Sequence, residues 1–142
     1  MGLDNGIIIR ANTKKGYSYL KRHFIYLQGT SNNFSYEFGY WRKCWNVREK
    51  FITDFKYDKE NYLITFKISD IPAIIDALKC FLNEENWEYN GRTSLVFNWY
   101  EELPSIANAI RNLYLFYDYI DEDDDEDDVT DEDFDIYFYD SY

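Results

Sequence analysis

The side chains with the most obvious chemical potential form one acidic run near the end of the chain. Between positions 121 and 133 the sequence is DEDDDEDDVTDED, so 11 of its 13 residues are carboxylates. A calcium-binding EF-hand loop places oxygen ligands at fixed positions along 12 residues. That spacing is met by Asp121, Asp123, Asp125 and Glu132. The sixth position, however, is Glu126, where the sharp turn of such a loop requires glycine. We therefore expect no specific metal site here.

The same run has a second interpretation, as an electrostatic docking segment. Closely spaced carboxylates imitate the charge line of a nucleic acid and are attracted over long distances to basic protein surfaces. The alternative is a solvated run that serves solubility or neutralises basic residues of its own chain. The candidate interaction residues are Asp121, Glu122, Asp123, Asp124, Asp125, Glu126, Asp127, Asp128, Asp131, Glu132 and Asp133.

Charge is distributed unevenly along the chain, whose net charge is −12. Residues 118–142 contain 14 acidic and no basic side chains, whereas residues 1–50 carry a net charge of +6. A protein that binds nucleic acid directly needs the opposite overall balance, because its affinity comes from neutralising phosphates. The expected partner is therefore a protein with a basic surface, such as a nucleic-acid-binding protein, and not nucleic acid itself.

A secondary candidate site falls in a helix predicted over residues 41–55, where apolar side chains recur at helical spacing. Arg42 and Lys43 would lie near the helix N-terminus, where cations oppose the helix dipole. Arg48 falls on the apolar stripe and needs an acidic or carbonyl partner. Together with Trp41, these residues could bind a phosphate-containing ligand in a small enzyme or a nucleotide-binding protein. The alternative is that Arg48 has a structural role.

The chain lacks the usual catalytic constellations. His23 is its only histidine, and Cys44 and Cys80 form no CxxC pair. Glycine-rich phosphate loops and the GxSxG motif of hydrolases are also missing from the sequence. No apolar stretch approaches the roughly 18 residues that a membrane span requires. We therefore expect a cytoplasmic protein without a cofactor that binds a partner and is not an enzyme, with an assembly role as a further alternative.

The patterning predicts one α+β domain over residues 1–142, with the acidic loop 121–133 inside it. We expect a mainly antiparallel sheet of about five to six strands, with three helices on one of its faces. The strands are expected at 6–10, 23–27, 34–38, 62–68, 95–97 and 134–139. The helices are expected at 41–55, from Ile71 to Leu82 behind an Asp70 N-cap with Pro72 in the first turn, and from near Pro104 to Tyr117.

Two features of this arrangement can be tested directly. The strands on either side of the GTSNN turn at 29–33 are expected to form a hairpin, and residues 11–19 are expected to form a polar loop. Phe134, Ile136 and Phe138 share one face of the last segment, which predicts a C-terminal strand that returns to the sheet.

Three short segments carry a resemblance to a family. They are the opening Met1–Asp4, the segment Gly39–Lys43 and the ending Tyr137–Tyr142. They resemble the small uncharacterised phage and bacterial proteins that begin MGLDMYL, carry YWRK before a helix and end in residues similar to YYQSSW. The chain departs from that pattern at Asn5 and Gly6, and it has no histidine after YWRK. The resemblance implies a phage or mobile-element origin and a compact fold, without a mechanism.

Overall fold

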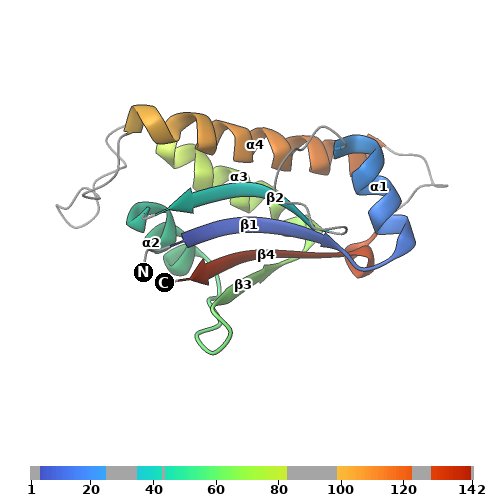
Figure 1. Cartoon of the computed structure of the whole chain (residues 1–142), viewed down its shortest axis with the longest axis horizontal. Helices are drawn as coiled ribbons and strands as arrows, with labels where there is room; N and C mark the ends of the chain where they lie inside the picture. Colours follow the sequence, from blue (N-terminus) through green and yellow to red (C-terminus); the bar gives the residue numbers. More distant parts are fainter. Residues whose placement is uncertain (1–3, 25–34, 43, 83–98, 123–128, 142) are drawn as a thin grey trace.

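The computed structural model describes residues 4–24, 35–42, 44–82, 99–122 and 129–141 (Figure 1). The strands are β1 (Asp4–Ala11), β2 (Ser35–Arg42), β3 (Leu63–Phe66) and β4 (Phe134–Ser141). The α-helices are α1 (Lys14–Phe24), α2 (Trp45–Asp54), α3 (Ile71–Lys79) and α4 (Trp99–Glu122). Three short 3-10 helices are η1 (Ile68–Asp70), η2 (Cys80–Leu82) and η5 (Asp131–Asp133).

The four strands form one sheet in the order β2-β1-β4-β3, and each neighbouring pair is antiparallel. The predicted α+β class and the antiparallel sheet are therefore confirmed. The numbers differ from the expected five to six strands and three helices, because the described part of the chain has four strands and four α-helices. The returning C-terminal strand is also confirmed, and β4 lies inside the sheet between β1 and β3.

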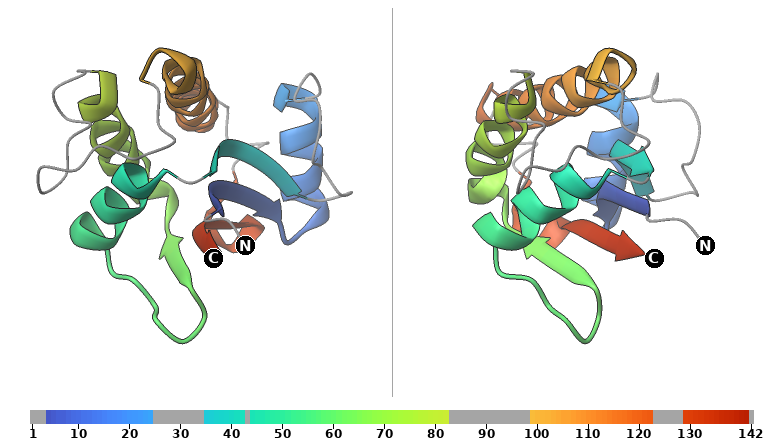
Figure 2. Two further views of the ribbon diagram at one scale, coloured as in Figure 1. Left: turned by 60° about the vertical axis from the view of Figure 1, so that its left-hand side comes forward. Right: turned by 90° about the vertical axis from the view of Figure 1, so that its left-hand side faces the viewer.

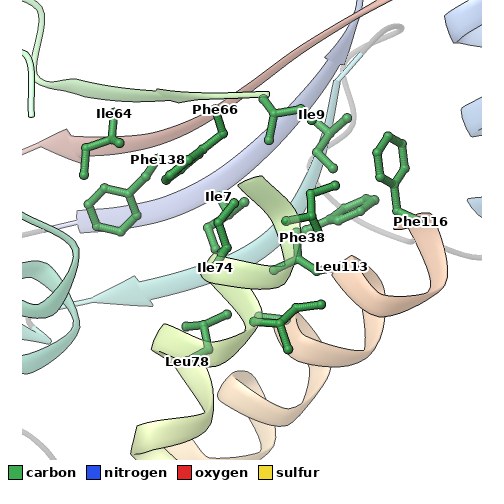
Figure 3. Packing of buried hydrophobic residues seen from close by; sticks show 14 of the residues in the cluster. Ile7, Ile9, Phe38, Ile64, Phe66, Ile74, Leu78, Leu113, Phe116 and Phe138 are labelled. Carbon is green, nitrogen blue, oxygen red and sulfur yellow. The ribbon is translucent and has the colours of Figure 1, made fainter. Parts of the chain in front are cut away.

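The helices lie on one face of the sheet, as expected (Figure 2). Side chains of β4 alternate between buried and partly exposed, which is the period-two pattern of a strand with one covered face. Phe134, Ile136 and Phe138 are its buried apolar side chains. They belong to one apolar core that is rich in aromatic rings, and Figure 3 shows Phe138 in this core with Ile74 of α3 and Leu113 of α4.

Strand β2 is adapted to receive α4. The pairing of β1 with β2 shifts between Ile7 and Ile8, so Phe38 has no partner across the pair and packs into the core. A Cβ atom on Gly39 would lie 2.5 Å from the Trp41 ring and 3.0 Å from Ala109 of α4. Gly39 therefore leaves the room in which the Trp41 ring and α4 pack against the sheet.

Residues 11–19 were expected to form a loop, and this prediction is wrong because α1 begins at Lys14. The hydroxyl of Thr13 accepts a hydrogen bond from the Gly16 amide at 3.0 Å, which caps the first turn. Adjacent lysines at the start hid the helical spacing of Gly16, Tyr19 and Leu20, which are buried. His23 and Phe24 belong to the same helix, so they do not begin a strand. The rest of that predicted strand and the turn of the expected hairpin lie outside the described residues, and among the described strands β2 pairs with β1.

The helix predicted over residues 41–55 is shorter than expected. Trp41 and Arg42 end strand β2, and α2 begins only at Trp45. The error has a simple origin, because a buried Trp41 fits both a strand with period two and a helix with period 3.6. Arg42 therefore ends a strand and does not occupy the first turn of the helix, and Lys43 lies outside the described residues.

The remaining helix and strand predictions were partly right. The strand at 62–68 shortens to β3, and α3 has Asp70 at its N-cap position and Pro72 in its first turn, as expected. Helix α4 begins at Trp99, so Pro104 lies inside it. On α4, Ala107 and Tyr117 are exposed, although both are apolar residues of the predicted helix. The face that packs on the sheet is set by Ile106, Ala109, Leu113 and Phe116, which are fully buried. The strand predicted at 95–97 lies outside the described residues.

Candidate interaction surface

Segments from both ends and from the middle of the chain meet at one end of the sheet. Asn5 of β1 lies opposite Trp41 of β2 on one side and opposite Asp140 of β4 on the other. Gly6 likewise lies between Tyr40 and Tyr139. The fold therefore places β1, β2 and β4 in register at this end of the sheet, although up to 135 positions separate their hydrogen-bonded side chains.

The face of the sheet opposite the helices carries a row of aromatic and apolar side chains. At this end the row runs across all four strands through Tyr40, Gly6, Tyr139 and Leu63, with an Ile8–Tyr137 pair beside it. No described helix covers this face (Figure 2). Tyr40 is 41% exposed, and Tyr137 and Tyr139 are partly exposed. We call this surface the open face.

Carboxylates hold two of these tyrosines in place. The Tyr40 hydroxyl donates to Asp4 Oδ1 at 2.8 Å, and the Tyr139 hydroxyl donates to Glu37 Oε2 at 3.3 Å. Burial, with the Glu37 carboxylate as the next cause, raises the pKa of Tyr139 far above its ordinary value. These two tyrosines, each fixed by a carboxylate, give this end of the open face a rigid aromatic surface with acidic neighbours.

A buried ion pair lies behind the open face, on the helix side of the sheet. Arg48 of α2 donates from Nε to both carboxylate oxygens of Asp140, at 2.9 and 3.1 Å. The Asp140 side chain has no exposed surface, and that of Arg48 is 13% exposed. Asn5 Nδ2 and the Tyr57 hydroxyl also donate to this carboxylate, at 2.9 and 2.6 Å. We call Asn5, Arg48, Tyr57 and Asp140 the Asp140 cluster.

The predicted need of Arg48 for an acidic partner is confirmed by this cluster. Because Asp140 neutralises its charge, Arg48 does not present an unbalanced cation to a phosphate ligand. Trp41 is fully buried, and Arg42 ends strand β2. The side chain of Arg42 and all of Lys43 lie outside the described residues. The structure therefore brings Trp41 and Arg48 to one end of the sheet, and a phosphate site that includes Arg42 and Lys43 stays a prediction.

Tyr57 gives the Asp140 cluster a measurable dependence on pH. Burial first, and then the hydrogen bond to Asp140, raise the pKa of Tyr57 to about 12. An unfolded tyrosine ionises near pH 10, so its contribution to stability is complete below pH 10 and is lost as the pH rises to about 12. Wild-type protein should therefore lose more stability between pH 9 and 11.5 than the Tyr57→Phe variant. Urea unfolding midpoints measured across this range test the expectation, and equal slopes would contradict it.

Sequence reasoning missed Asp140, Asn5 and Tyr57 as members of a site. A signal for one of them was present, because Asp140 continues the buried face of Phe134, Ile136 and Phe138 at period two. A carboxylate on the apolar face of a strand and a guanidinium on the apolar stripe of a helix are natural partners. The positions of Asn5 and Tyr57 carried no such signal.

The described part of the acidic run is built into the fold at both ends. Asp121 and Glu122 form the last turn of α4, and residues 123–128 lie outside the described residues. Asp131 accepts a hydrogen bond from the Ile68 amide at 2.6 Å. Asp133 is buried and accepts hydrogen bonds from the Thr13 hydroxyl and from the Thr130 amide. Of the last three carboxylates, Glu132 is exposed and has no side-chain contact among the described residues.

The end of α4 concentrates negative charge at an unfavourable place. A helix C-terminus carries partial negative charge from its free carbonyls, and it is normally offset by basic side chains. The last turn of α4 contains no basic residue and ends on Asp121 and Glu122, after Asp118 in the preceding turn. This repulsion makes the end of the helix a favourable place for an external cation or a basic protein surface.

Histidine, cysteine and carboxylate side chains form no group of three that could hold a metal ion in the part of the chain that the structure covers. None of the described helices combines the length and the apolar composition needed to cross a membrane. The two cysteines form no disulfide, and Cys44 is buried whereas Cys80 is partly buried.

Known proteins add nothing to what the fold and these surfaces show. No protein-family model, no curated protein and no solved structure matches the chain.

Proposed function

We propose that the chain is an interaction protein, encoded by a phage or a mobile element, that docks on a host or defence protein with a basic surface. The observation that carries this proposal is the concentration of 14 carboxylates and no cations in residues 118–142. The uncompensated C-terminal end of α4 lies at the start of the acidic run and adds to the same field. In this proposal the partner is a nucleic-acid-binding protein, and the acidic run occupies the groove that otherwise receives phosphates.

The open face supports the same kind of interaction. Rigid tyrosines supply a large contact area at low entropic cost, and they are enriched where protein interfaces bind most strongly. Asp4 and Glu37 beside them favour a partner with basic residues at the rim of its binding surface. The phage or mobile-element origin is supported by the family resemblance of three short segments.

A pull-down from bacterial host lysate tests the proposal. The wild-type chain is compared at 50 and 500 mM salt with a variant in which the acidic residues 121–128 are changed to Asn and Gln. The expected partner binds the wild type at low salt, weakens at high salt and is lost from the neutralised variant. The control neutralises Asp76, which is exposed on α3 outside the run, and should retain the partner. A partner held equally by all three proteins at both salt concentrations would reject docking by electrostatic mimicry.

A further inference from the structure

The segment between α2 and β3 ends in a tight turn that protrudes from the sheet (Figures 1 and 2). Asp58 and Leu63 close the turn, and the Asp58 amide donates to the Leu63 carbonyl at 2.8 Å. The Tyr62 amide donates back to the Asp58 carbonyl at 2.9 Å. We call residues 58–62 the Tyr62 turn.

Side-chain hydrogen bonds hold the Tyr62 turn in one conformation. The Asp58 carboxylate accepts from the Glu60 amide at 2.9 Å, from the Asn61 amide at 3.2 Å and from Asn61 Nδ2 at 2.8 Å. These bonds favour the charged carboxylate and lower the pKa of Asp58. The turn is therefore shaped before it meets any partner, which reduces the entropy lost on binding.

Hydrogen bonds to Asp140 attach the Tyr62 turn to the Asp140 cluster. Tyr57, which precedes the turn, donates its hydroxyl to Asp140 at 2.6 Å. The amide of Asp140 donates to the carbonyl of Tyr62 at 2.9 Å. Both ends of the turn are thereby attached to the residue that forms the buried ion pair with Arg48.

Tyr62 itself has an unfavourable backbone conformation, which hydrogen bonds of its amide and carbonyl hold in place. Its φ is 58°, in the left-handed region that glycine and asparagine occupy easily and a bulky side chain does not. The side chain is 55% exposed. Among the described residues it has neither a hydrogen bond nor a ring contact. Backbone strain combined with an exposed aromatic ring, on a rigid turn, is characteristic of a binding element.

We infer that the Tyr62 turn is a preformed recognition element whose ring inserts into an apolar pocket on the partner protein. The inference rests on the proposed interaction function and adds a specific contact to it. Within the turn, Lys59 and Glu60 offset each other in charge, as Asp58 is offset by the preceding Lys56. The contact of Tyr62 should therefore be insensitive to salt, unlike docking through the acidic run. A protein pocket is favoured over a nucleic acid because the chain has a net charge of −12.

The first test measures stability and needs no partner. Tyr62→Gly and Tyr62→Asn relieve the left-handed strain, so each should raise Tm by roughly 2–4 °C. Tyr114 on α4 is the matched control, because it is 58% exposed within a regular helix. Tyr114→Gly should lower Tm, since glycine destabilises a helix interior. A fall in Tm for both Tyr62 variants would show that the ring serves the fold, and it would overturn the inference.

The second test locates the contact with a photoreactive phenylalanine analogue placed at position 62 or at position 114. After irradiation in bacterial host lysate, the inference predicts one protein adduct from position 62 and none from position 114. An excess of unlabelled wild-type protein should abolish the adduct. The Tyr62→Gly protein should need at least a tenfold higher concentration to reduce the adduct to the same extent. No adduct from position 62, or equal competition by both proteins, would overturn the inference.

The two proposals can fail separately. Repeating the cross-linking at 50 and 500 mM salt, with and without the neutralised acidic run, distinguishes them. An adduct at position 62 that survives both changes supports the Tyr62 turn and rejects the acidic run as the principal contact. A partner that depends on the acidic run but forms no adduct at position 62 supports the proposed function and rejects the Tyr62 contact.

Discussion

Replacing Asp140 with asparagine should destabilise the fold by about 3 kcal/mol, the low end of the range for breaking a buried ion pair. The change removes the buried counter-charge of Arg48, whose side chain is only 13% exposed, and leaves it the partly exposed Glu49 carboxylate at 3.4 Å. It also weakens the hydrogen bonds from Asn5 and Tyr57, which stabilise the charged carboxylate. Chemical denaturation at pH 7, followed by tryptophan fluorescence or circular dichroism, measures the loss.

Strand β4 provides a matched control in Asp135. This residue forms an ion pair of nearly the same length with Arg10, at 3.0 Å, but the two side chains are 46% and 53% exposed. Asp135→Asn should therefore cost less than about 1 kcal/mol, because water screens and solvates both charges. Equal losses at the two positions would show that burial of the Asp140 pair is not the decisive factor.

A double substitution separates the pair from its individual charges. Removing Arg48 and Asp140 together, as Arg48→Met with Asp140→Asn, leaves no isolated buried charge. The double variant should be destabilised by less than the sum of the two single variants, with a coupling of about 1–3 kcal/mol. Additive losses would indicate that the two side chains contribute independently.

Replacing Phe138 with alanine should destabilise the protein by about 3–5 kcal/mol, as expected for a fully buried phenylalanine. Phe138 lies in the interior strand β4 and has no exposed surface. Its ring stacks on that of Phe51 of α2, with a centroid distance of 4.5 Å and an angle of 2° between the ring planes. The substitution removes this stacking and opens a cavity between the sheet and α2. Thermal and urea unfolding measure the effect.

Two further variants, a smaller change at Phe138 and a change on the opposite face of β4, serve as controls for Phe138→Ala. Phe138→Leu keeps most of the buried volume and should cost roughly 1–1.5 kcal/mol. Tyr137→Ala changes the neighbouring residue on the open face, where the side chain is only partly buried, and should cost less than Phe138→Ala. If Tyr137→Ala were the more damaging change, the assignment of the core to the helix side of the sheet would be wrong.

The contacts of Phe138 and Asp140 with α2 form one structural unit. Phe138 and Asp140 are alternate residues on the same face of β4, and α2 contacts them through Phe51 and Arg48. Loss of either contact should loosen α2 and the Tyr62 turn that follows it. Destabilisation at Asp140 should therefore also weaken binding through Tyr62, whereas Asp135→Asn should leave that binding unchanged.

The patterns that predicted elements correctly were those in which local periodicity admitted one solution. The alternation of Phe134, Ile136 and Phe138 could be met only by a strand with one buried face, and the structure has that strand. Asp70 and Pro72 marked the start of α3 because an N-cap followed by a first-turn proline has a direct backbone meaning. The uneven charge is a property of the sequence alone and needs no fold.

Prediction failed where one pattern served two structures or where the signal was not local. Trp41 fits both a strand and a helix, and only its pairing opposite Asn5 decides for the strand. The lysines before Gly16 concealed α1, whose start depends on a cap from Thr13 and on the close approach of Asp133 to Gly16.

The sequence by itself determined the α+β class, the returning C-terminal strand, the acidic run and the need of Arg48 for a partner. Only the tertiary structure decided that this partner is Asp140, 92 positions away, and that the same carboxylate fixes the Tyr62 turn. The physical reason is that periodicity and capping act over a few residues, whereas strand order and side-chain pairing depend on long-range packing. The strain at Tyr62 likewise arises only when β3, β4 and the Asp58 bonds close the turn around it.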